Sequence, residues 1–164
     1  MEYKFLSWTD VEESCLQVYK KMLDDYFVPD AIVGLLRGGV VPARIFADYF
    51  GILMDFYAMD VKLYTGIGER NENPVIKPFH IDLTGKKILI VDDILDSGET
   101  MGAVLNELKE EDVTTATVCW KESAPAKPDY YQNIVKDDEW IIFPWEKNEF
   151  CRLKESKESQ NEKR

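Results

Sequence analysis

The chain has 164 residues, of which 45% are hydrophobic and 31% charged, and its formal net charge at pH 7 is -11. This composition is typical of a folded globule and excludes a disordered chain, and the length fits one domain with a sizeable core. The negative charge argues against a protein that binds nucleic acid by neutralising phosphates, because such proteins carry a basic surface. An acidic protein can still bind a phosphorylated small molecule where backbone donors or a metal ion offset the repulsion.

The N-terminal segment and the cysteines predict a cytoplasmic protein. The first ten residues, MEYKFLSWTD, contain no long apolar run, so we predict no secretory signal. No segment approaches the roughly 18 consecutive apolar residues that a membrane span needs. Cys15, Cys119 and Cys151 lack metal-ligand spacing, and reduced thiols are the expectation. We therefore expect neither a membrane partner nor disulfides.

Helix and strand patterns alternate in the first third of the chain. Apolar residues at three- to four-residue spacing predict a helix over 9–26, with the capping box TDVE at its start. The apolar run AIVGLL, residues 31–36, is typical of a strand buried on both faces. A second helix is predicted to begin near Pro42 and to end at Gly51. A second strand is predicted within 52–59.

The rest of the chain begins with a segment without clear periodicity, residues 60–84. A segment of that length inside a compact domain is usually functional or mobile. Beyond it, the patterns predict a strand over 88–91, a helix over 101–110, and strands over 113–120 and 139–143.

Strands that alternate with helices predict an α/β fold, doubly wound around a mostly parallel sheet. We expect a single domain over residues 1–150. The last segment, 151–164, is polar and mixed in charge, so we predict a flexible tail.

The stretch ILIVDDILDSGETM carries the strongest functional signal. Its apolar strand runs directly into Asp92 and Asp93, at the strand end where open α/β sheets gather ligands. The segment 96–100 then starts the next helix, where unpaired N–H groups and the helix dipole favour an anion. Ser97 and Thr100 add hydroxyl donors. The pattern predicts a sugar phosphate, with its phosphate in the loop and its hydroxyls against the two carboxylates.

Simpler interpretations of this stretch stay open. Asp96 and Ser97 can serve as plain helix caps, and Asp92 and Asp93 can belong to a solvated turn. A solvated turn is the weaker alternative, because two acids directly after buried residues are costly unless a cation or hydroxyl donors partner them. A carboxylate pair of this kind can also hold Mg²⁺ together with substrate oxygens.

The segment VDDILDSGET resembles the signature of type I phosphoribosyltransferases, which bind 5-phosphoribosyl-1-pyrophosphate (PRPP). Its apolar strand, two acids, two apolar residues and D-[ST]-G-x-T all match. The resemblance implies that Asp92 and Asp93 hold the ribose hydroxyls, directly or through Mg²⁺. It also implies a cradle for the 5-phosphate made of Asp96, Ser97, Gly98, Glu99 and Thr100.

A second turn, in LLRGGVVPA, also follows a predicted buried strand. Arg37 brings a positive charge, and Gly38 and Gly39 expose backbone donors, which suits a pyrophosphate. A tight strand-to-helix turn without a ligand is an equally good interpretation of this segment alone. In the family that the first motif resembles, the corresponding turn contacts pyrophosphate.

The resemblance also assigns the loop 62–77 to the family's mobile flap. Displacement of pyrophosphate passes through an oxocarbenium-like state that water would intercept, so a closing flap has a physical purpose. Tyr64, Arg70 and Lys77 are the candidates for contacts to the leaving group, with a plain surface loop as the alternative.

The C-terminal third offers groups for an accepting base. Lys121 ends a predicted strand, Trp140 offers a flat stacking surface with Ile141 as its apolar neighbour, and Glu146 offers an acceptor. Together they resemble the base-binding hood, here about 121–150, of 6-oxopurine phosphoribosyltransferases, especially the short xanthine-guanine type. In that family the lysine contacts the purine 6-oxo group.

This part of the resemblance has one departure and several alternatives. The bacterial enzymes carry aspartate where this chain has Glu146, whose extra methylene extends the reach of the carboxylate toward the purine 2-position. The less favoured alternatives are that Trp140 and Ile141 are core residues of a strand and that Lys121 is a solvated strand end.

The sequence as a whole therefore predicts a purine salvage enzyme that moves the phosphoribosyl group from PRPP to N9 of guanine, xanthine or hypoxanthine. The resemblance implies Mg²⁺ as cofactor, Asp96 as the base that accepts the purine proton, and a homo-oligomer by analogy. One alternative is a regulator with this fold that binds nucleic acid, which the net charge opposes. Another is a transferase for a pyrimidine base.

Overall fold

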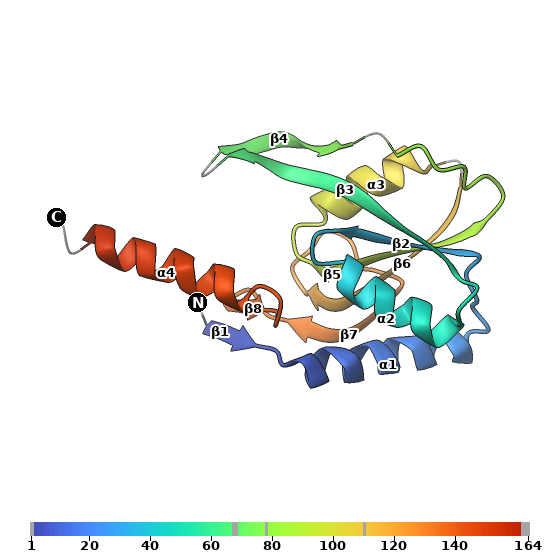
Figure 1. The fold of residues 1–164 in the computed structure, drawn as a ribbon, viewed down its shortest axis with the longest axis horizontal. Coiled ribbons are helices and arrows are strands. Elements are labelled where there is room, and N and C mark those ends of the chain that lie inside the picture. Colours follow the sequence, from blue (N-terminus) through green and yellow to red (C-terminus); the bar gives the residue numbers. More distant parts are fainter. Residues whose placement is uncertain (1, 67–68, 78, 110, 162–164) are drawn as a thin grey trace.

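A mostly parallel sheet carries helices on both of its faces (Figure 1). The computed structural model describes residues 2–66, 69–77, 79–109 and 111–161. Its strands are β1 (Glu2–Phe5), β2 (Ala31–Leu36), β3 (Asp55–Gly66), β4 (Glu69–Ile76), β5 (Lys87–Leu95), β6 (Asp112–Lys121), β7 (Tyr130–Val135) and β8 (Glu139–Ile142). Its helices are α1 (Trp8–Asp24), α2 (Val40–Phe50), α3 (Glu99–Glu107) and α4 (Lys147–Asn161).

The strand order places β2 and β5 at the centre of the molecule. The main sheet has six strands in the order β4-β3-β2-β5-β6-β7, and only the β3–β4 pair is antiparallel. A separate parallel pair, β1 with β8, joins the two ends of the chain. The predicted α/β fold with a mostly parallel sheet is confirmed.

The core consists of two apolar layers, one on each face of the main sheet. Val11 of α1 and Phe46 of α2 lie in one hydrophobic cluster with Val91, whereas Val104 of α3 lies in the other with Ile90. All five side chains are fully buried. Successive residues of a strand point to opposite faces, so burial of both faces explains the continuous apolar runs. None of the helices in the described ranges is long and apolar enough to cross a membrane.

The first helix begins earlier than its pattern predicted. Ser7, in extended conformation, caps α1: its Oγ accepts a hydrogen bond from the Asp10 amide at 3.1 Å, and the Asp10 carboxylate accepts one from the Ser7 amide at 2.7 Å. The predicted box TDVE is therefore wrong by two residues. Two overlapping segments, 7–10 and 9–12, have a hydroxyl residue followed three positions later by an acid. The earlier of the two caps α1.

The segment 60–84, predicted as a loop, is largely an antiparallel hairpin. Strand β3 continues to Gly66 and pairs with β4, with irregular register on both sides of Tyr64. These irregularities break the period-two alternation by which a strand is identified from sequence. The hairpin extends away from the body of the sheet (Figure 1).

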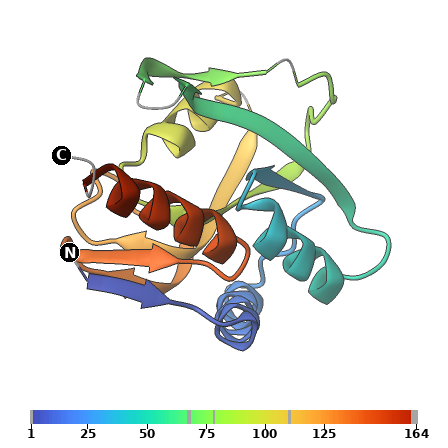
Figure 2. The ribbon, with the colours of Figure 1, turned by 60° about the vertical axis from the view of Figure 1, so that its left-hand side comes forward.

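The two ends of the chain contain elements that the sequence pattern did not indicate. All four side chains of β1 are exposed, so its alternation carries no signal, and its partner β8 lies at the far end of the sequence. The predicted tail, 151–164, begins inside α4, whose backbone is helical as far as Asn161. Figure 2 shows α4 in front of the β1–β8 pair.

Gly34 sets how closely α2 approaches the sheet. A Cβ atom at this position would lie 2.8 Å from both the Ala43 Cβ and the Val40 Cα. Because one of these is a backbone atom, α2 would have to move. We predict that Gly34→Ala lowers the free energy of unfolding by about 1–3 kcal/mol, measured in urea.

The matched control is Gly102→Ala in α3, where an added Cβ meets nothing within 4 Å. That variant should gain about 0.5–1 kcal/mol, because alanine loses less backbone entropy in a helix. Equal stability of the Gly34 variant and the wild type would contradict the close packing of α2 on β2.

Candidate active site

The turns that follow β2 and β5 meet at one edge of the sheet. The two strands are parallel neighbours, with Ala31 opposite Ile88 and Gly34 opposite Val91. A Cβ atom at Gly38 would overlap the Asp93 carboxylate, and one at Gly39 would lie 2.5 Å from the Val91 carbonyl oxygen. Only glycine fits at either position. The first turn therefore packs directly on the acidic pair in the last part of β5, a strand that continues beyond its predicted end, to Leu95.

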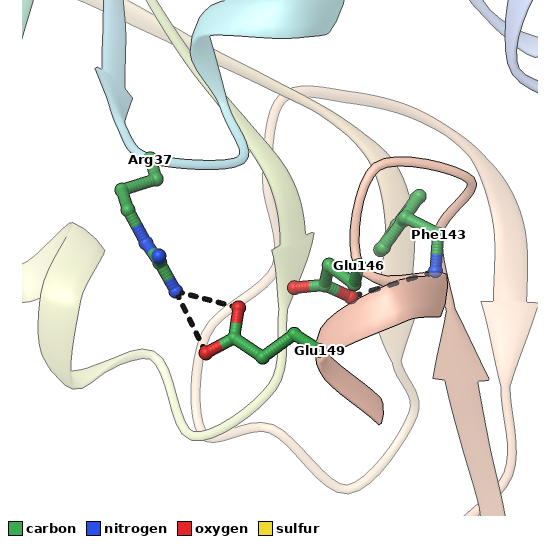
Figure 3. Close-up of polar contacts among 4 residues, drawn as sticks. All are labelled: Arg37, Phe143, Glu146 and Glu149. Carbon is green, nitrogen blue, oxygen red and sulfur yellow. Dashed lines mark hydrogen bonds and ion pairs between the residues drawn. The ribbon is translucent and has the colours of Figure 1, made fainter. Parts of the chain in front are cut away.

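The side chain of Arg37 reaches out of the first turn toward α4 (Figure 3). The peptide bond between Leu36 and Arg37 is cis. Arg37 Nη2 donates to both carboxylate oxygens of Glu149, at 3.0 and 3.3 Å. Both side chains are largely exposed, at 84% and 55%. The guanidinium is thus next to the cavity described below but does not line it.

A cavity of about 530 Å³ lies beside the acidic pair. It brings together the end of β5, the loop before α3 and two residues of the C-terminal third. Its lining residues are Asp92, Asp93, Ile94, Leu95, Asp96, Ser97, Gly98, Thr100, Met101, Trp140 and Glu146.

Asp93 is buried and Asp92 half-buried, and neither has a cationic partner among the described residues. Burial raises the pKa of Asp92 well above its ordinary value, and the neighbouring charge of Asp93 raises it further. Burial also raises the pKa of Asp93, whose side chain is only 8% exposed. Asp93 Oδ1 accepts one hydrogen bond from the Ile94 amide at 2.8 Å. The surroundings of the pair therefore disfavour its charged form, which a cation or hydroxyl donors would stabilise.

Such a pair suits a divalent cation that is shared with a ligand. No group of three or more His, Cys, Asp or Glu in the described ranges could hold a metal by itself. A magnesium ion bound by Asp92 and Asp93 would take its other ligands from substrate oxygens and water, as this ion usually does.

The loop before α3 has the form of an anion site. Gly98, with φ of +77°, is the N-cap of α3, and the helix starts without a hydrogen bond from a side-chain cap. Ser97 Oγ accepts only a long contact, 3.4 Å, from the Glu99 amide. Plain capping by Asp96 or Ser97 therefore does not describe the helix start. The N-terminal end of α3 and its positive dipole point to the same cavity as the acidic pair.

Lys121, at the end of β6, lies next to this loop. Its Nζ is 3.1 Å from Asp96 Oδ1, and the lysine side chain is only 18% exposed while that of Asp96 is 51% exposed. The alternative of a solvated strand end therefore does not describe Lys121. The sequence did not predict that these two site residues would pair with each other.

The hood residues separate into two groups. Trp140 and Glu146 line the cavity, whereas Ile141 packs against the hydrophobic core cluster and does not reach the cavity. Glu146 Oε2 accepts a long hydrogen bond of 3.4 Å from the Phe143 amide. Burial raises the pKa of Glu146, and the negative charge of Asp93 raises it further.

The flap candidates lie on the β3–β4 hairpin. Tyr64 and Arg70 are partners in its backbone register, and their side chains lie outside what the structure describes. Lys77 follows β4, forms an ion pair with Asp60 and does not line the cavity. The hydrogen bond from Lys77 lowers the pKa of Asp60.

Glu149 is the residue near the site that the sequence did not reveal. It lies in the first turn of α4, whose amino-acid pattern is polar, and its relation to Arg37 spans 112 residues. Because only the tertiary structure brings α4 to the turn after β2, no local pattern could have identified it.

Comparisons with known proteins identify the family. A family model described as a phosphoribosyl transferase domain matches residues 7–148. The xanthine-guanine phosphoribosyltransferase of Cereibacter sphaeroides is 38% identical over 118 residues, which cover 71% of this chain and 68% of that protein. The corresponding protein of Gluconobacter oxydans is 29% identical over 147 residues, 89% and 86% of the two chains.

A solved structure agrees with this result. The purine phosphoribosyltransferase from Pyrococcus horikoshii Ot3 superposes with a TM-score of 0.75 at 34% identity, covering 88% of this chain and 94% of that one. The chain belongs to the phosphoribosyltransferase family. The resemblance found in the sequence, to a transferase of this family, is thereby confirmed.

The raised pKa values of the acidic pair predict how stability depends on pH. A carboxyl group with a raised pKa in the folded state binds more protons there than in the unfolded chain. Stability is therefore lost as the pH rises from the ordinary carboxyl range through the folded-state pKa. Replacing Asp93 by the neutral Asn removes this loss. We predict that Asp93→Asn raises the free energy of unfolding near pH 7 by about 1–3 kcal/mol.

Urea unfolding from pH 4 to 8, without Mg²⁺ or phosphorylated ligands, measures this difference. The stabilisation should shrink toward pH 4, where the wild-type carboxyl group is protonated in the folded state and about half protonated in the unfolded chain. Asp137→Asn, at an exposed turn position, is the matched control and should change little. A destabilised Asp93 variant at neutral pH would show that the carboxylate is compensated in the folded protein.

Proposed function

We propose that this protein transfers the 5-phosphoribosyl group of PRPP to N9 of a 6-oxopurine (guanine, xanthine or hypoxanthine) and releases pyrophosphate. One observation carries the proposal: the turn at Arg37–Gly39 packs on Asp92 and Asp93 beside a cavity that also contains an anion-type helix start. A phosphorylated pentose with a diphosphate at its anomeric carbon fits this order of groups. Its phosphate suits the helix start, its hydroxyls suit the two acids, and its diphosphate suits the turn.

In this proposal PRPP lies along the carboxyl edge of the sheet. Its 5-phosphate occupies the loop of Asp96, Ser97, Gly98, Glu99 and Thr100, where backbone N–H groups and the α3 dipole favour an anion. Its ribose hydroxyls contact Asp92 and Asp93, directly or through the shared Mg²⁺. Its pyrophosphate contacts the turn of Arg37, Gly38 and Gly39. The bound ion would add positive charge beside Asp92 and Asp93, which have no cationic partner among the described residues.

The base occupies the hood side of the cavity. Trp140 supplies a flat surface for the purine ring and Glu146 a carboxyl group near its 2-position, while Lys121 contacts the 6-oxo group. Ile141, which packs on the core, contributes through its backbone or by fixing β8. A cation at the 6-position favours an oxo group over the amino group of adenine, because an amino group offers a donor where an acceptor is needed.

The chemistry then follows from position and charge. The purine nitrogen attacks the anomeric carbon as the bond to pyrophosphate breaks, and positive charge develops on the ribose beside Asp92 and Asp93. Asp96 accepts the proton of the attacking nitrogen, a contribution of about 10²- to 10⁴-fold. Since Asp96 is ion-paired with Lys121 before substrates bind, the base separates this pair and engages both partners. Positioning and electrostatics supply most of the remaining acceleration.

The surroundings of the reaction are also part of the proposal. The β3–β4 hairpin, with Tyr64, Arg70 and Lys77 as candidate contacts to the leaving group, closes over the cavity and excludes water. We expect a cytoplasmic homo-oligomer by analogy with the family, with neither nucleic acid nor membrane as partner.

Nucleotide formation tests the function directly. The protein is incubated with PRPP, Mg²⁺ and one base at a time, including adenine and orotate, and the product is followed by absorbance. We predict turnover with one or more 6-oxopurines. Asp93→Asn should remain folded, as argued above, yet lose turnover by about 10²-fold or more, the range for loss of one preorganised charged group. Wild-type-like kinetics of this variant would remove the acidic pair from the mechanism.

Lys121→Ala tests the base assignment. Loss of one charged hydrogen bond, about 1.5–3 kcal/mol, predicts a rise of about ten- to hundredfold in the KM for the purine, with a smaller change in the KM for PRPP. The control is Lys109→Ala, an exposed lysine beyond the end of α3. An unchanged KM for the purine in the Lys121 variant would contradict the assignment of the hood.

A further inference from the structure

Arg37, the cation of the proposed pyrophosphate turn, already has an anionic partner within the chain. Its Nη2 contacts both carboxylate oxygens of Glu149, at 3.0 and 3.3 Å. A carboxylate held in this way resembles one edge of a phosphate group, because arginine binds both anions through the same N–H donors. Figure 3 shows Glu149 reaching Arg37 from the first turn of α4.

Aromatic packing on β1 fixes the place from which Glu149 acts. The ring of the next residue, Phe150, lies edge-on to those of Tyr3 and Phe5, with centroids 4.9 and 5.7 Å apart. The Phe150 amide also donates to the Glu146 carbonyl at 2.9 Å. The start of α4 is therefore anchored to β1.

The charges around this contact are unfavourable for an anionic ligand. Burial raises the pKa of Glu146 most, and the negative charges of Asp93 and Glu149 raise it further. The positive charge of Arg37 lowers it. Arg37 thus lies among carboxylates. A pyrophosphate group that binds Arg37 has to displace Glu149 and to overcome the repulsion from the remaining acids.

We infer that Glu149 is a built-in competitor for the pyrophosphate position: it occupies Arg37 in the ligand-free protein and thereby weakens the binding of PRPP and of free pyrophosphate. This inference rests on the proposed function for the identity of the ligand. This competition also gives α4 a regulatory role, because any change that moves α4 away from β1 also releases Arg37 from Glu149.

The alternative role for Glu149 predicts the opposite sign. If the carboxylate orients Arg37 for the ligand, its removal weakens ligand binding. If it competes, its removal strengthens binding. The sign of the change in affinity therefore decides between the two roles.

The first measurement is calorimetric binding of pyrophosphate, with Mg²⁺ present, to the wild type and to Glu149→Gln. Exposed ion pairs have modest strength, so we expect a Kd about two- to fivefold lower in the variant. The KM for PRPP should fall by a similar factor. The difference should diminish when the salt concentration rises to about 0.5 M, because salt screens exposed charges. Unchanged or weaker binding in the variant would overturn the inference.

Three further variants make the result specific. Glu13→Gln removes one exposed acid of α1 and should leave the Kd unchanged. In an Arg37→Ala background, Glu149→Gln should lose its effect, since no guanidinium remains to be released. Phe150→Ala, which removes the anchor of α4, should strengthen pyrophosphate binding in the same direction as Glu149→Gln. An equal gain with and without Arg37 would contradict a role through that residue.

The proposed function and this inference fail in different ways. A wild-type protein that forms no nucleotide from PRPP with any base removes the proposed function. A wild type that forms nucleotide, with a Glu149→Gln variant whose pyrophosphate Kd and KM for PRPP are not lowered, removes only the competitor role.

Discussion

The close packing of the turn after β2 on the acidic end of β5 is the contact on which the rest of the structure depends. Parallel neighbours end at the same edge of a sheet, so pairing of β2 with β5 brings the two turns together. Gly38 and Gly39 then let the backbone approach Asp93 and Val91 more closely than any side chain allows. This contact places the backbone donors of the turn next to the two carboxylates, which is the arrangement that the proposed sugar diphosphate needs.

The same contact costs stability. Asp93 is buried next to the half-buried Asp92, and the described part of the chain offers them no cation. Two desolvated carboxylates are unfavourable in the free protein and become favourable when a ligand brings hydroxyl donors and a divalent ion. The sheet core, with two fully buried apolar layers, supplies the rigidity that holds the pair in place. Stability and ligand affinity are therefore opposed at this point of the fold.

The two basic side chains next to the cavity are both paired with acids before any ligand binds. Lys121 lies 3.1 Å from Asp96, and Arg37 lies 3.0 Å from Glu149. Each cation is thereby held near the place where an anion or an oxo group would be needed. In the proposed function, ligand binding would exchange these partners rather than fill an open positive site. The local exchange matters more here than the net charge of the whole chain.

The sequence alone determined the parts of this protein that rest on local rules. Buried apolar runs identified β2 and β5, and the order of elements identified a mostly parallel sheet. The motif at the start of α3 indicated an anion site because the residues that form this site are consecutive in the sequence. The β3–β4 hairpin was not recognised, since its irregular register hides the alternation of a strand.

Only the tertiary structure decided which distant groups meet. It pairs β1 with β8, turns Ile141 to the core and Trp140 to the cavity, and brings Glu149 to Arg37. The β1–β8 pair and the contact of Arg37 with Glu149 join residues more than 100 positions apart. No local pattern records such a contact, because it forms only once elements that are far apart in the sequence have packed into one structure.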